Sequence, residues 1–273
     1  MDELTSTPTA VREGEWAVRW RPLRQARLRL FCLPHAGGGA AFFRSWAQRL
    51  GPEIEVVAIR LPGRENRFRE RPYDRLDDLL PPLVRSVAPL LDRPHAWLGH
   101  SMGAGIAFEI CRTQRRLGLP DPVRLLAAAS PAPHLPRRET PVHNASAPEL
   151  FVRLGQLQGT SSEALRNEAL LNVMLPTLRA DFAVAETHVH RPGPPLDCPI
   201  TVYGGQSDES AVEEELDAWC RHSTADTTVR IFPGGHFFLH EAPDRFLPVL
   251  ENDLVGRGVL PPHLSSGRNH ATQ

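Results

Sequence analysis

The sequence places a serine between two glycines, in the segment 99–103, which reads GHSMG. Apolar residues at 96–98 precede this segment and are typical of a buried strand, whereas residues 104–111 have the pattern of a helix that is beginning. A serine at a sharp strand-to-helix turn is typical of a nucleophile elbow, in which the glycines leave room for neighbouring backbone. The hydroxyl of Ser101 would then stand at a helix N-terminus, where free N–H groups stabilise a developing negative charge.

A serine hydroxyl becomes a strong nucleophile only when a neighbouring base takes its proton, and an acid must hold that base in the right tautomer. His236 is the predicted base, because it follows the expected strand 229–232 and a Pro-Gly-Gly turn. His240 is the alternative base, although it falls inside the next expected helix.

Asp208 is the predicted acid. It follows the expected strand 200–203 and a short turn, and it completes the chain order serine, acid, histidine. Asp226 precedes a strand and therefore falls on the opposite edge of a parallel sheet. The segment 130–133, where the acid of such a triad can also stand, contains no carboxylate.

Acyl transfer also needs two hydrogen-bond donors for the negative oxygen that forms at the carbonyl. The backbone N–H of Met102 is one predicted donor, and the N–H of Ala36 is the other, with Gly37 as its alternative. His35 precedes them in the loop and is expected to shape it. The three glycines at 37–39 lack the spacing of a dinucleotide-binding fold, and no acidic residue closes the next strand.

Short apolar runs alternate with helical patterns along the chain, which predicts a mostly parallel sheet covered by helices on both faces. The expected strands are 15–20, 28–33, 54–60, 96–100, 123–130, 200–203 and 229–232, and the expected helices are 43–50, 76–91, 102–117, 212–221 and 243–254. We assign residues 14–260 to a single domain, between polar tails at 1–13 and 261–273.

The stretch 131–195 interrupts this alternation, because it is proline-rich at both ends and carries helical patterns with apolar faces between them. An insertion of this length predicts a helical cap over the carboxyl edge of the sheet. Met174, Leu178 and Phe182, with Phe237 beside the predicted base, are expected to line an acyl chamber. Packing within the cap is the alternative role for these apolar residues.

The composition excludes several classes of protein. The 273 residues carry a net charge of −1, with 31 basic and 32 acidic side chains, so we expect no binding to nucleic acid. No apolar stretch is long enough to cross a bilayer, and the polar N-terminus has no signal-peptide pattern. The four cysteines stand in apolar contexts without a CxxC pair, which predicts reduced, buried thiols in a cytoplasmic protein. We expect neither a metal ion nor a cofactor.

Five segments, in this order, resemble the type II thioesterases, which are discrete α/β-hydrolases that accompany polyketide and non-ribosomal peptide synthases. They are LPHAGG at 33–38, LPGRE at 61–65, GHSMG at 99–103, the glycine pair at 204–205 with Asp208, and GGHFF at 234–238. The resemblance implies the α/β-hydrolase fold, a mostly parallel sheet flanked by helices, with a helical cap inserted before the late strands.

The resemblance also implies hydrolysis of acyl groups from the phosphopantetheine thiol of carrier proteins, through an acyl-enzyme on Ser101, which would clear stalled or misprimed units. Acyl or peptidyl carrier proteins of a synthase are then the implied partners, and the phosphopantetheine arm belongs to the substrate. Because carrier proteins are usually acidic and the arm bears a phosphate, Arg64 and Arg67 are candidates for docking. Glu65 and Glu70 dilute the charge of their loop, and an ordinary solvated loop is the alternative.

Two other functions fit the same residues. A serine esterase that acts on small free esters would use the same serine, acid and base. A non-catalytic protein that binds acyl chains, or docks on a synthase, would keep only the fold. The complete set of three reactive side chains favours catalysis over the last of these.

Overall fold

The computed structural model describes residues 15–157 and 167–256. Within these residues a sheet of seven strands has the order β1-β3-β2-β4-β5-β6-β7, in which only β1 is antiparallel to its neighbour. The strands are β1 (Ala17–Val18), β2 (Leu28–Leu33), β3 (Ile54–Ile59), β4 (His95–His100), β5 (Arg124–Ala128), β6 (Ile200–Gly205) and β7 (Thr227–Phe232). Each predicted strand segment overlaps one of them, so the predicted mostly parallel sheet is confirmed.

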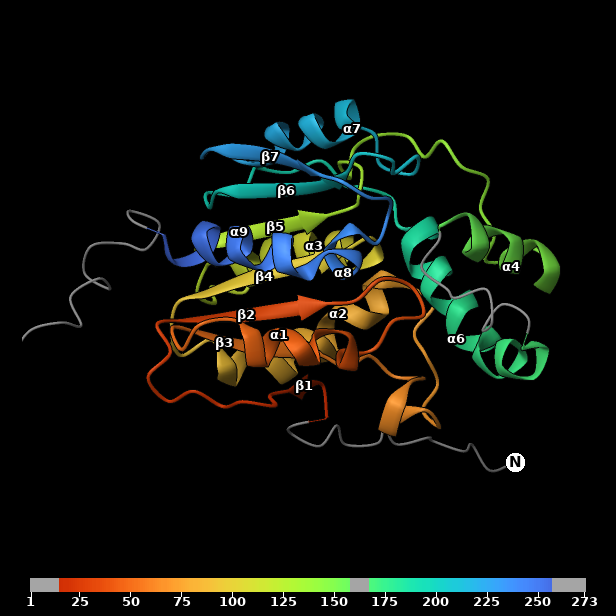
Figure 1. Cartoon of the computed structure of the whole chain (residues 1–273), viewed down its shortest axis with the longest axis horizontal. Helices are drawn as coiled ribbons and strands as arrows, with labels where there is room; N and C mark the ends of the chain where they lie inside the picture. Colours follow the sequence, from red (N-terminus) through yellow and green to blue (C-terminus); the bar gives the residue numbers. More distant parts are fainter. Residues whose placement is uncertain (1–14, 158–166, 257–273) are drawn as a thin grey trace, which may run out of the picture.

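Helices cover both faces of the sheet, and Figure 1 shows α1 and α9 on one face and α2 and α3 on the other. The helices are α1 (Arg44–Arg49), α2 (Leu76–Val87), α3 (Met102–Arg116), α4 (Ala147–Gln156), α6 (Glu168–Thr187), α7 (Glu213–Asp217), α8 (Phe238–Glu241) and α9 (Pro243–Val255). Short 3-10 helices are η1 (Ala40–Phe43), η2 (Glu65–Arg67), η3 (Ala88–Leu90) and η4 (Ala218–His222). Both faces of the central strands are therefore buried, as a parallel sheet requires.

Alternate residues of each strand enter different cores. In β2, Leu30 belongs to the core that contains Trp46 of α1, whereas Phe31 belongs to the core that contains Leu83 of α2. This alternation follows from the two-residue period of a strand, which sends successive side chains to opposite faces. The two cores hold the strand ends, and thus the loops that follow them, in fixed positions.

The segment between β5 and β6 carries α4 and α6, which lie beyond the carboxyl ends of the parallel strands (Figure 1). Ser146 begins α4 with a reciprocal capping box to Glu149. A small apolar cluster joins the two helices through Leu150 and Leu154 of α4 and Leu178 and Phe182 of α6. The cap over the sheet edge therefore has a core of its own.

Two further predictions concern the ends of the chain and its thiols. The predicted tails, 1–13 and 261–273, lie outside the described residues. No helix in the described ranges combines the length and apolar composition that a bilayer span requires. Cys32, Cys111 and Cys198 are buried as expected, but Cys220 is exposed, since the inward side of η4 carries other residues.

Leu83 provides a test of the packing that supports the sheet, because it lies in α2 and is fully buried. We expect Leu83→Ala to lower the free energy of unfolding by about 2–5 kcal/mol, because the site would lose apolar contacts and leave a cavity. Urea denaturation of the variant and the wild type measures this difference. A loss below about 1 kcal/mol would mean that α2 contributes little to the core.

Candidate active site

Ser101 lies at the turn between β4 and α3, with φ 55° and ψ −116°, in a region that non-glycine residues rarely adopt. A β-carbon on Gly99 would lie 2.1 Å from the carbonyl oxygen of Gly103, and one on Gly103 would lie 2.4 Å from that of Leu33. Only glycine fits at both positions, so the strained turn depends on them. The elbow geometry that the sequence predicts is therefore present.

Asp208 and His236 meet at the carboxyl ends of neighbouring strands. Asp208 follows β6, His236 follows β7, and 2.8 Å separates Nδ1 of His236 from Oδ2 of Asp208. Both side chains are buried. An ionised carboxylate only accepts hydrogen bonds, so Nδ1 carries the proton and Nε2 keeps its lone pair. This is the tautomer that a general base needs.

Ser210 is a member of this arrangement that the sequence did not reveal. Its backbone N–H and its hydroxyl donate to Oδ1 of Asp208 at 3.0 and 2.6 Å, and its Oγ lies 3.0 Å from Nδ1 of His236. Burial acts to raise the pKa of Asp208, but the hydrogen bond and charge of His236 and the two bonds from Ser210 outweigh it. The pKa of Asp208 is thus lowered, and the carboxylate stays ionised.

His100, the residue before the serine, holds the loop that carries the predicted base. It is fully buried, and its Nε2 lies 2.9 Å from the backbone oxygen of His236. A carbonyl oxygen can only accept, so Nε2–H of His100 is the donor. Burial, with the nearby His236, lowers the pKa of His100 to about 3, so its ring is neutral at pH 7.

The alternatives for base and acid lie elsewhere. His240 is in α8, where its ring packs on Phe42 and Trp46, and burial lowers its pKa to about 2. Asp226 precedes β7 and therefore lies at the amino edge of the sheet. Neither is among the residues that line the cavity described next.

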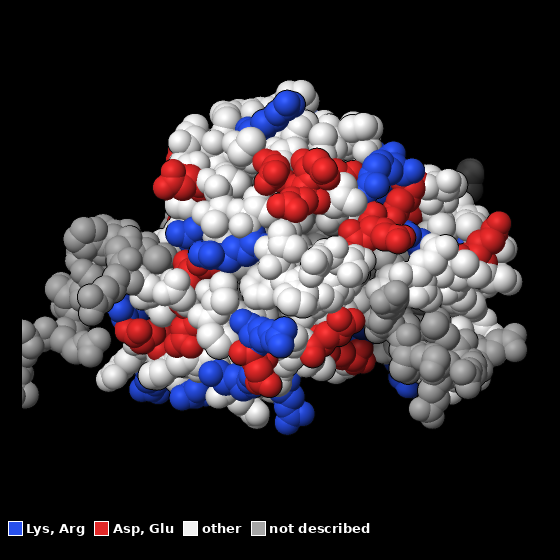
Figure 2. All heavy atoms as spheres, turned by 45° about the horizontal axis from the view of Figure 1, so that its top comes forward, with Lys and Arg blue, Asp and Glu red and all other residues white. Residues whose placement is uncertain are grey.

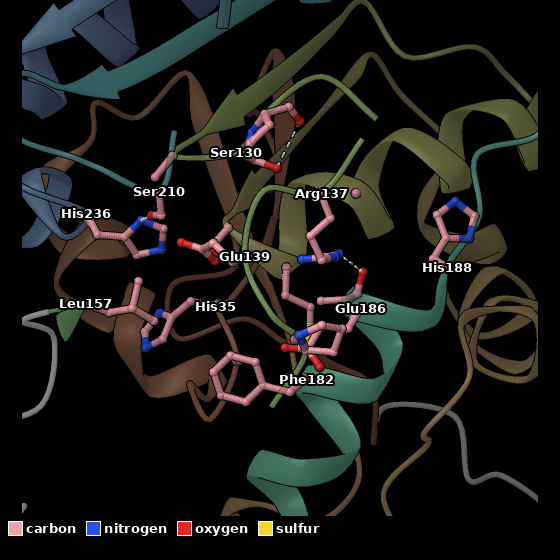
Figure 3. A pocket seen from close by; sticks show the side chains of 18 of the residues that line it. His35, Ser130, Arg137, Glu139, Leu157, Phe182, Glu186, His188, Ser210 and His236 are labelled. Atoms are coloured by element: carbon pink, nitrogen blue, oxygen red, sulfur yellow. Dashed lines mark hydrogen bonds between the residues drawn. The ribbon is translucent and has the colours of Figure 1, made fainter. Parts of the chain in front are cut away.

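A cavity of about 1100 Å³ lies between the sheet edge and the cap, and both Ser101 and His236 line it. In Figure 3 the ring of His236 lies beside Ser210, and side chains of the segment after β5 and of α6 surround the same space. Among the described residues the hydroxyl of Ser101 has no hydrogen bond to His236. Such contacts are often loose in proteins without substrate and tighten when it binds.

The predicted donors, Ala36 and Met102, both line this cavity close to Ser101 in the fold. Their backbone N–H groups donate to no other group within the described part of the chain. The alternative donor, Gly37, is engaged, because its N–H donates to Oδ2 of Asp181 at 2.7 Å. The geometry therefore favours Ala36 over Gly37.

His35 packs among aromatic rings in this loop. Its ring centroid lies 4.6 Å from that of Phe42, 4.7 Å from that of Phe237 and 5.1 Å from that of His100. Burial and the neighbouring histidines hold the pKa of His35 well below its usual range. A neutral, packed ring agrees with the expected role in shaping the loop.

The four residues predicted for an acyl chamber all line the cavity: Met174, Leu178, Phe182 and Phe237. Apolar residues of both cap helices extend this wall, among them Leu154 and Leu171. Another part of the wall is polar and includes Arg137, Glu139, Glu186 and His188 (Figure 3). Contact between the apolar wall and an acyl chain stays a prediction.

The predicted docking role of Arg64 and Arg67 is wrong, because both side chains are buried and paired within the protein. Arg64 is 7% exposed and bonds Asp181, and Arg67 is 4% exposed, bonds Glu70 and stacks on Trp16. The sequence shows the charges of this loop but not that the distant Asp181 neutralises Arg64, nor that Arg67 is buried against Trp16. On the face in Figure 2, basic and acidic side chains are interspersed, with no broad basic field in view.

Within the described ranges, no group of three or more His, Cys, Asp or Glu side chains has an arrangement that could hold a metal ion. Two histidines beside the cavity, His134 and His222, have ring nitrogens 2.7 Å apart. Burial, with the neighbouring His134, lowers the pKa of His222 to about 4.

The family model for the thioesterase domain matches residues 28–254, which include every residue of the arrangement above. The chain belongs to the thioesterase family. It is thus a hydrolase of the α/β type that acts on thioesters. The gramicidin S biosynthesis protein GrsT of Aneurinibacillus migulanus is 37% identical over 251 residues, which are 92% of this chain and 97% of GrsT.

Solved structures of thioesterases have the same fold. BorB, the type II thioesterase from the borrelidin biosynthetic cluster, is 36% identical, with a TM-score of 0.79 over 90% of this chain and 100% of BorB. RedJ, the thioesterase of the prodiginine pathway in Streptomyces coelicolor, is 38% identical, with a TM-score of 0.77 over 84% of this chain and 87% of RedJ. The resemblance to type II thioesterases and the α/β-hydrolase fold are therefore confirmed.

Because burial lowers the pKa of His100, we expect this residue to make the folded protein less stable in acid. Between pH 6.5 and about 3 the unfolded chain binds a proton at this residue and the folded chain does not, so the free energy of unfolding falls as the pH falls. We expect His100→Gln, which keeps an N–H donor but does not titrate, to make this fall shallower. Because the variant takes up one proton fewer on unfolding, its free energy of unfolding should fall by about 1.4 kcal/mol less per pH unit.

Urea denaturation at a series of pH values compares the two slopes. Other buried histidines contribute to the slope of both proteins. One of them is His95, whose pKa burial lowers to about 4. Identical slopes in the variant and the wild type would show that His100 is not neutral in the folded protein.

Proposed function

We propose that this thioesterase hydrolyses acyl thioesters from the phosphopantetheine arm of carrier proteins, with Ser101 as nucleophile, His236 as base and Asp208 as the acid that orients it. The observation that carries the proposal is the Asp208–His236 hydrogen bond of 2.8 Å, on the wall of the cavity that Ser101 also lines. The N–H groups of Ala36 and Met102 supply the oxyanion donors. The chain itself supplies every group that the chemistry needs, so no cofactor takes part.

The reaction follows from these positions. Oγ of Ser101 attacks the thioester carbonyl while its proton passes to Nε2 of His236, and the carbonyl oxygen becomes an oxyanion held by the two amides. The carbon–sulfur bond then breaks, and the proton on Nε2 of His236 passes to the departing sulfur, which leaves as a thiol; with a pKa of about 8.5 it needs little help from an acid. Water then gives a proton to the neutral His236 and attacks the acyl-serine, and that proton passes to Oγ of Ser101 as the free acid leaves.

The names of the relatives support the choice of substrate. GrsT is named for gramicidin S biosynthesis, and BorB and RedJ for the borrelidin and prodiginine pathways. We infer that this enzyme likewise serves a polyketide or non-ribosomal peptide synthase, where it removes stalled or misprimed acyl units. Acyl or peptidyl carrier proteins would be its partners and the cytoplasm its location. The apolar wall with Met174, Leu178, Phe182 and Phe237 would receive the acyl chain.

Replacing the nucleophile and the base tests the assignment of roles. We expect Ser101→Ala and His236→Ala each to lower kcat by about four to six orders of magnitude, because neither can form the acyl-serine at a useful rate. Ser101→Ala should unfold at nearly the wild-type urea concentration, since the hydroxyl has no partner within the described residues. Turnover of Ser101→Ala at the wild-type rate would overturn the assignment of the nucleophile.

Substrate preference tests the proposed substrate class. We expect kcat/KM for an acyl-loaded carrier protein to exceed that for a free aryl ester with the same acyl group, because the cavity and its entrance would then hold both acyl chain and arm. Release of free acid, followed by mass spectrometry, measures both reactions. A strong preference for the aryl ester would indicate a serine esterase. Folded protein that fails to react with a fluorophosphonate at Ser101 would indicate a non-catalytic binding protein.

A further inference from the structure

Cap helix α6 contacts two loops of the sheet domain through one short stretch of its length. Oγ1 of Thr177 donates to the carbonyl oxygen of Gly63 at 2.7 Å. Leu178 lies against Gly37, so closely that a β-carbon there would meet it at 2.6 Å. Asp181, one turn further along α6, accepts the backbone N–H of Gly37 at 2.7 Å. The helix therefore touches the residue that follows the proposed oxyanion donor Ala36.

Arg64 completes this contact from the other loop. Its Nη1 and Nη2 donate to Oδ2 and Oδ1 of Asp181 at 2.8 and 2.6 Å, and its Nη1 also donates to the carbonyl oxygen of Gly38 at 2.8 Å. Both side chains are buried, with exposures of 7% for Arg64 and 2% for Asp181. A bidentate pair of this kind fixes direction as well as distance, because the guanidinium and the carboxylate are both planar.

Asp181 and Arg64 each hold one backbone group of the loop. Asp181 holds the N–H of Gly37, and Arg64 holds the carbonyl of Gly38. The N–H of Gly38 in turn donates to the carbonyl oxygen of His35 at 3.0 Å. That carbonyl belongs to the same trans peptide as the N–H of Ala36, so the two groups point in opposite directions. With the carbonyl turned into the loop, the N–H of Ala36 is turned away from it.

We infer that Asp181 and Arg64 are positioning residues that hold the N–H of Ala36 on the oxyanion, and that the oxyanion site is complete only while α6 is docked on the loop. This inference rests on the proposed function, in which Ala36 is an oxyanion donor. The energetics agree, because a buried ion pair often adds little to stability over apolar residues of similar size. The directional hydrogen bonds that the pair makes to Gly37 and Gly38 are contacts that apolar side chains could not supply.

The stretch of α6 that contacts the loop also lines the cavity. Leu178 lines the cavity and also packs on Gly37, and Asp181 lies three residues further along the same helix. The helix that lines the cavity through Leu178 is therefore also the helix that holds the oxyanion loop through Asp181.

Asp181→Asn tests the inference, because an amide keeps the size of the side chain but presents a donor to Gly37 or Arg64, both of which are donors themselves. The matched control is Asp253→Asn, in a second bidentate Arg–Asp pair whose carboxylate is buried while its arginine, Arg230, is 39% exposed. Asp253 is 6% exposed and accepts from Nε and Nη2 of Arg230 at 2.9 and 2.6 Å and from the hydroxyl of Tyr203 at 2.9 Å. It does not line the cavity.

Four quantities are measured for the wild type and both variants. They are kcat and KM for an acyl-N-acetylcysteamine thioester, the affinity for a trifluoromethyl ketone thioether, and the affinity for the matching thioether with a methylene in place of the carbonyl. The ketone forms a tetrahedral adduct with Ser101 and carries an oxyanion, whereas the methylene compound fills only the binding site. Loss of a whole oxyanion donor costs about 100- to 1000-fold in kcat.

For Asp181→Asn we expect kcat and the affinity for the trifluoromethyl ketone to fall together by about 10- to 100-fold, because the donor is misplaced rather than removed. KM and the affinity for the methylene compound should stay within about threefold of the wild type. Asp253→Asn should leave all of these values close to the wild type. If Asp181→Asn matches Asp253→Asn, or loses affinity for both inhibitors equally, the inference is wrong.

Arg64→Lys keeps the test decisive should Asp181→Asn fail to fold. A lysine preserves the charge opposite Asp181, but a single ammonium cannot reproduce the planar fork that joins Asp181 to the carbonyl of Gly38. We expect the same selective loss of kcat and of trifluoromethyl ketone affinity, smaller in size, and an unchanged kcat would contradict the inference. A wild type that does not bind the trifluoromethyl ketone would instead contradict the proposed function.

Discussion

The backbone at the start of α3 lies against the backbone of its neighbours with no side chain between them. Gly99 faces Gly103 across the elbow, and Gly103 faces the carbonyls of Leu33 and Pro34 at the end of β2. This contact forces Ser101 to a positive φ and brings the N–H of Met102 beside the loop that carries Ala36. The proposed nucleophile and both proposed oxyanion donors thus depend on the close approach of three backbone segments.

Residues from the same edge of the sheet complete the site around this contact. Parallel strands β6 and β7 end side by side, so the residues that follow them, Asp208 and His236, meet over the elbow. His100 ties the backbone of His236 to the end of β4, and Asp181 ties the cap to the loop after β2. Hydrogen bonds of the buried residues Asp208, His100 and Asp181 therefore hold His236 and the loop that carries Ala36 in place.

Much of this arrangement can be predicted from the sequence, because the reactive residues follow strands and carry local signals. The glycines around Ser101, the turn before Asp208 and the Pro-Gly-Gly before His236 are all visible in single segments. Asp181 and the pairing of Arg64 are not, since each depends on a partner distant in sequence. Ser210 is not either, because no local pattern shows that a serine two residues after Asp208 bonds both Asp208 and His236. Arg64 bonds Asp181 across 117 positions of the sequence, and neither composition nor hydrophobic periodicity can reveal such a pair. A charged side chain in a loop is usually solvated, which is why the docking prediction was wrong.

The central claim is that the acyl group passes through a covalent bond to Ser101, and trapping that bond tests it most directly. Wild-type enzyme is mixed with an acyl-loaded carrier protein, quenched in acid within the first turnover, digested and mapped by mass spectrometry. The account predicts that the mass of the acyl group appears on the peptide that contains Ser101 and disappears as free acid is released. Turnover with no acylated peptide at any time, or with the acyl group on another residue, would contradict it.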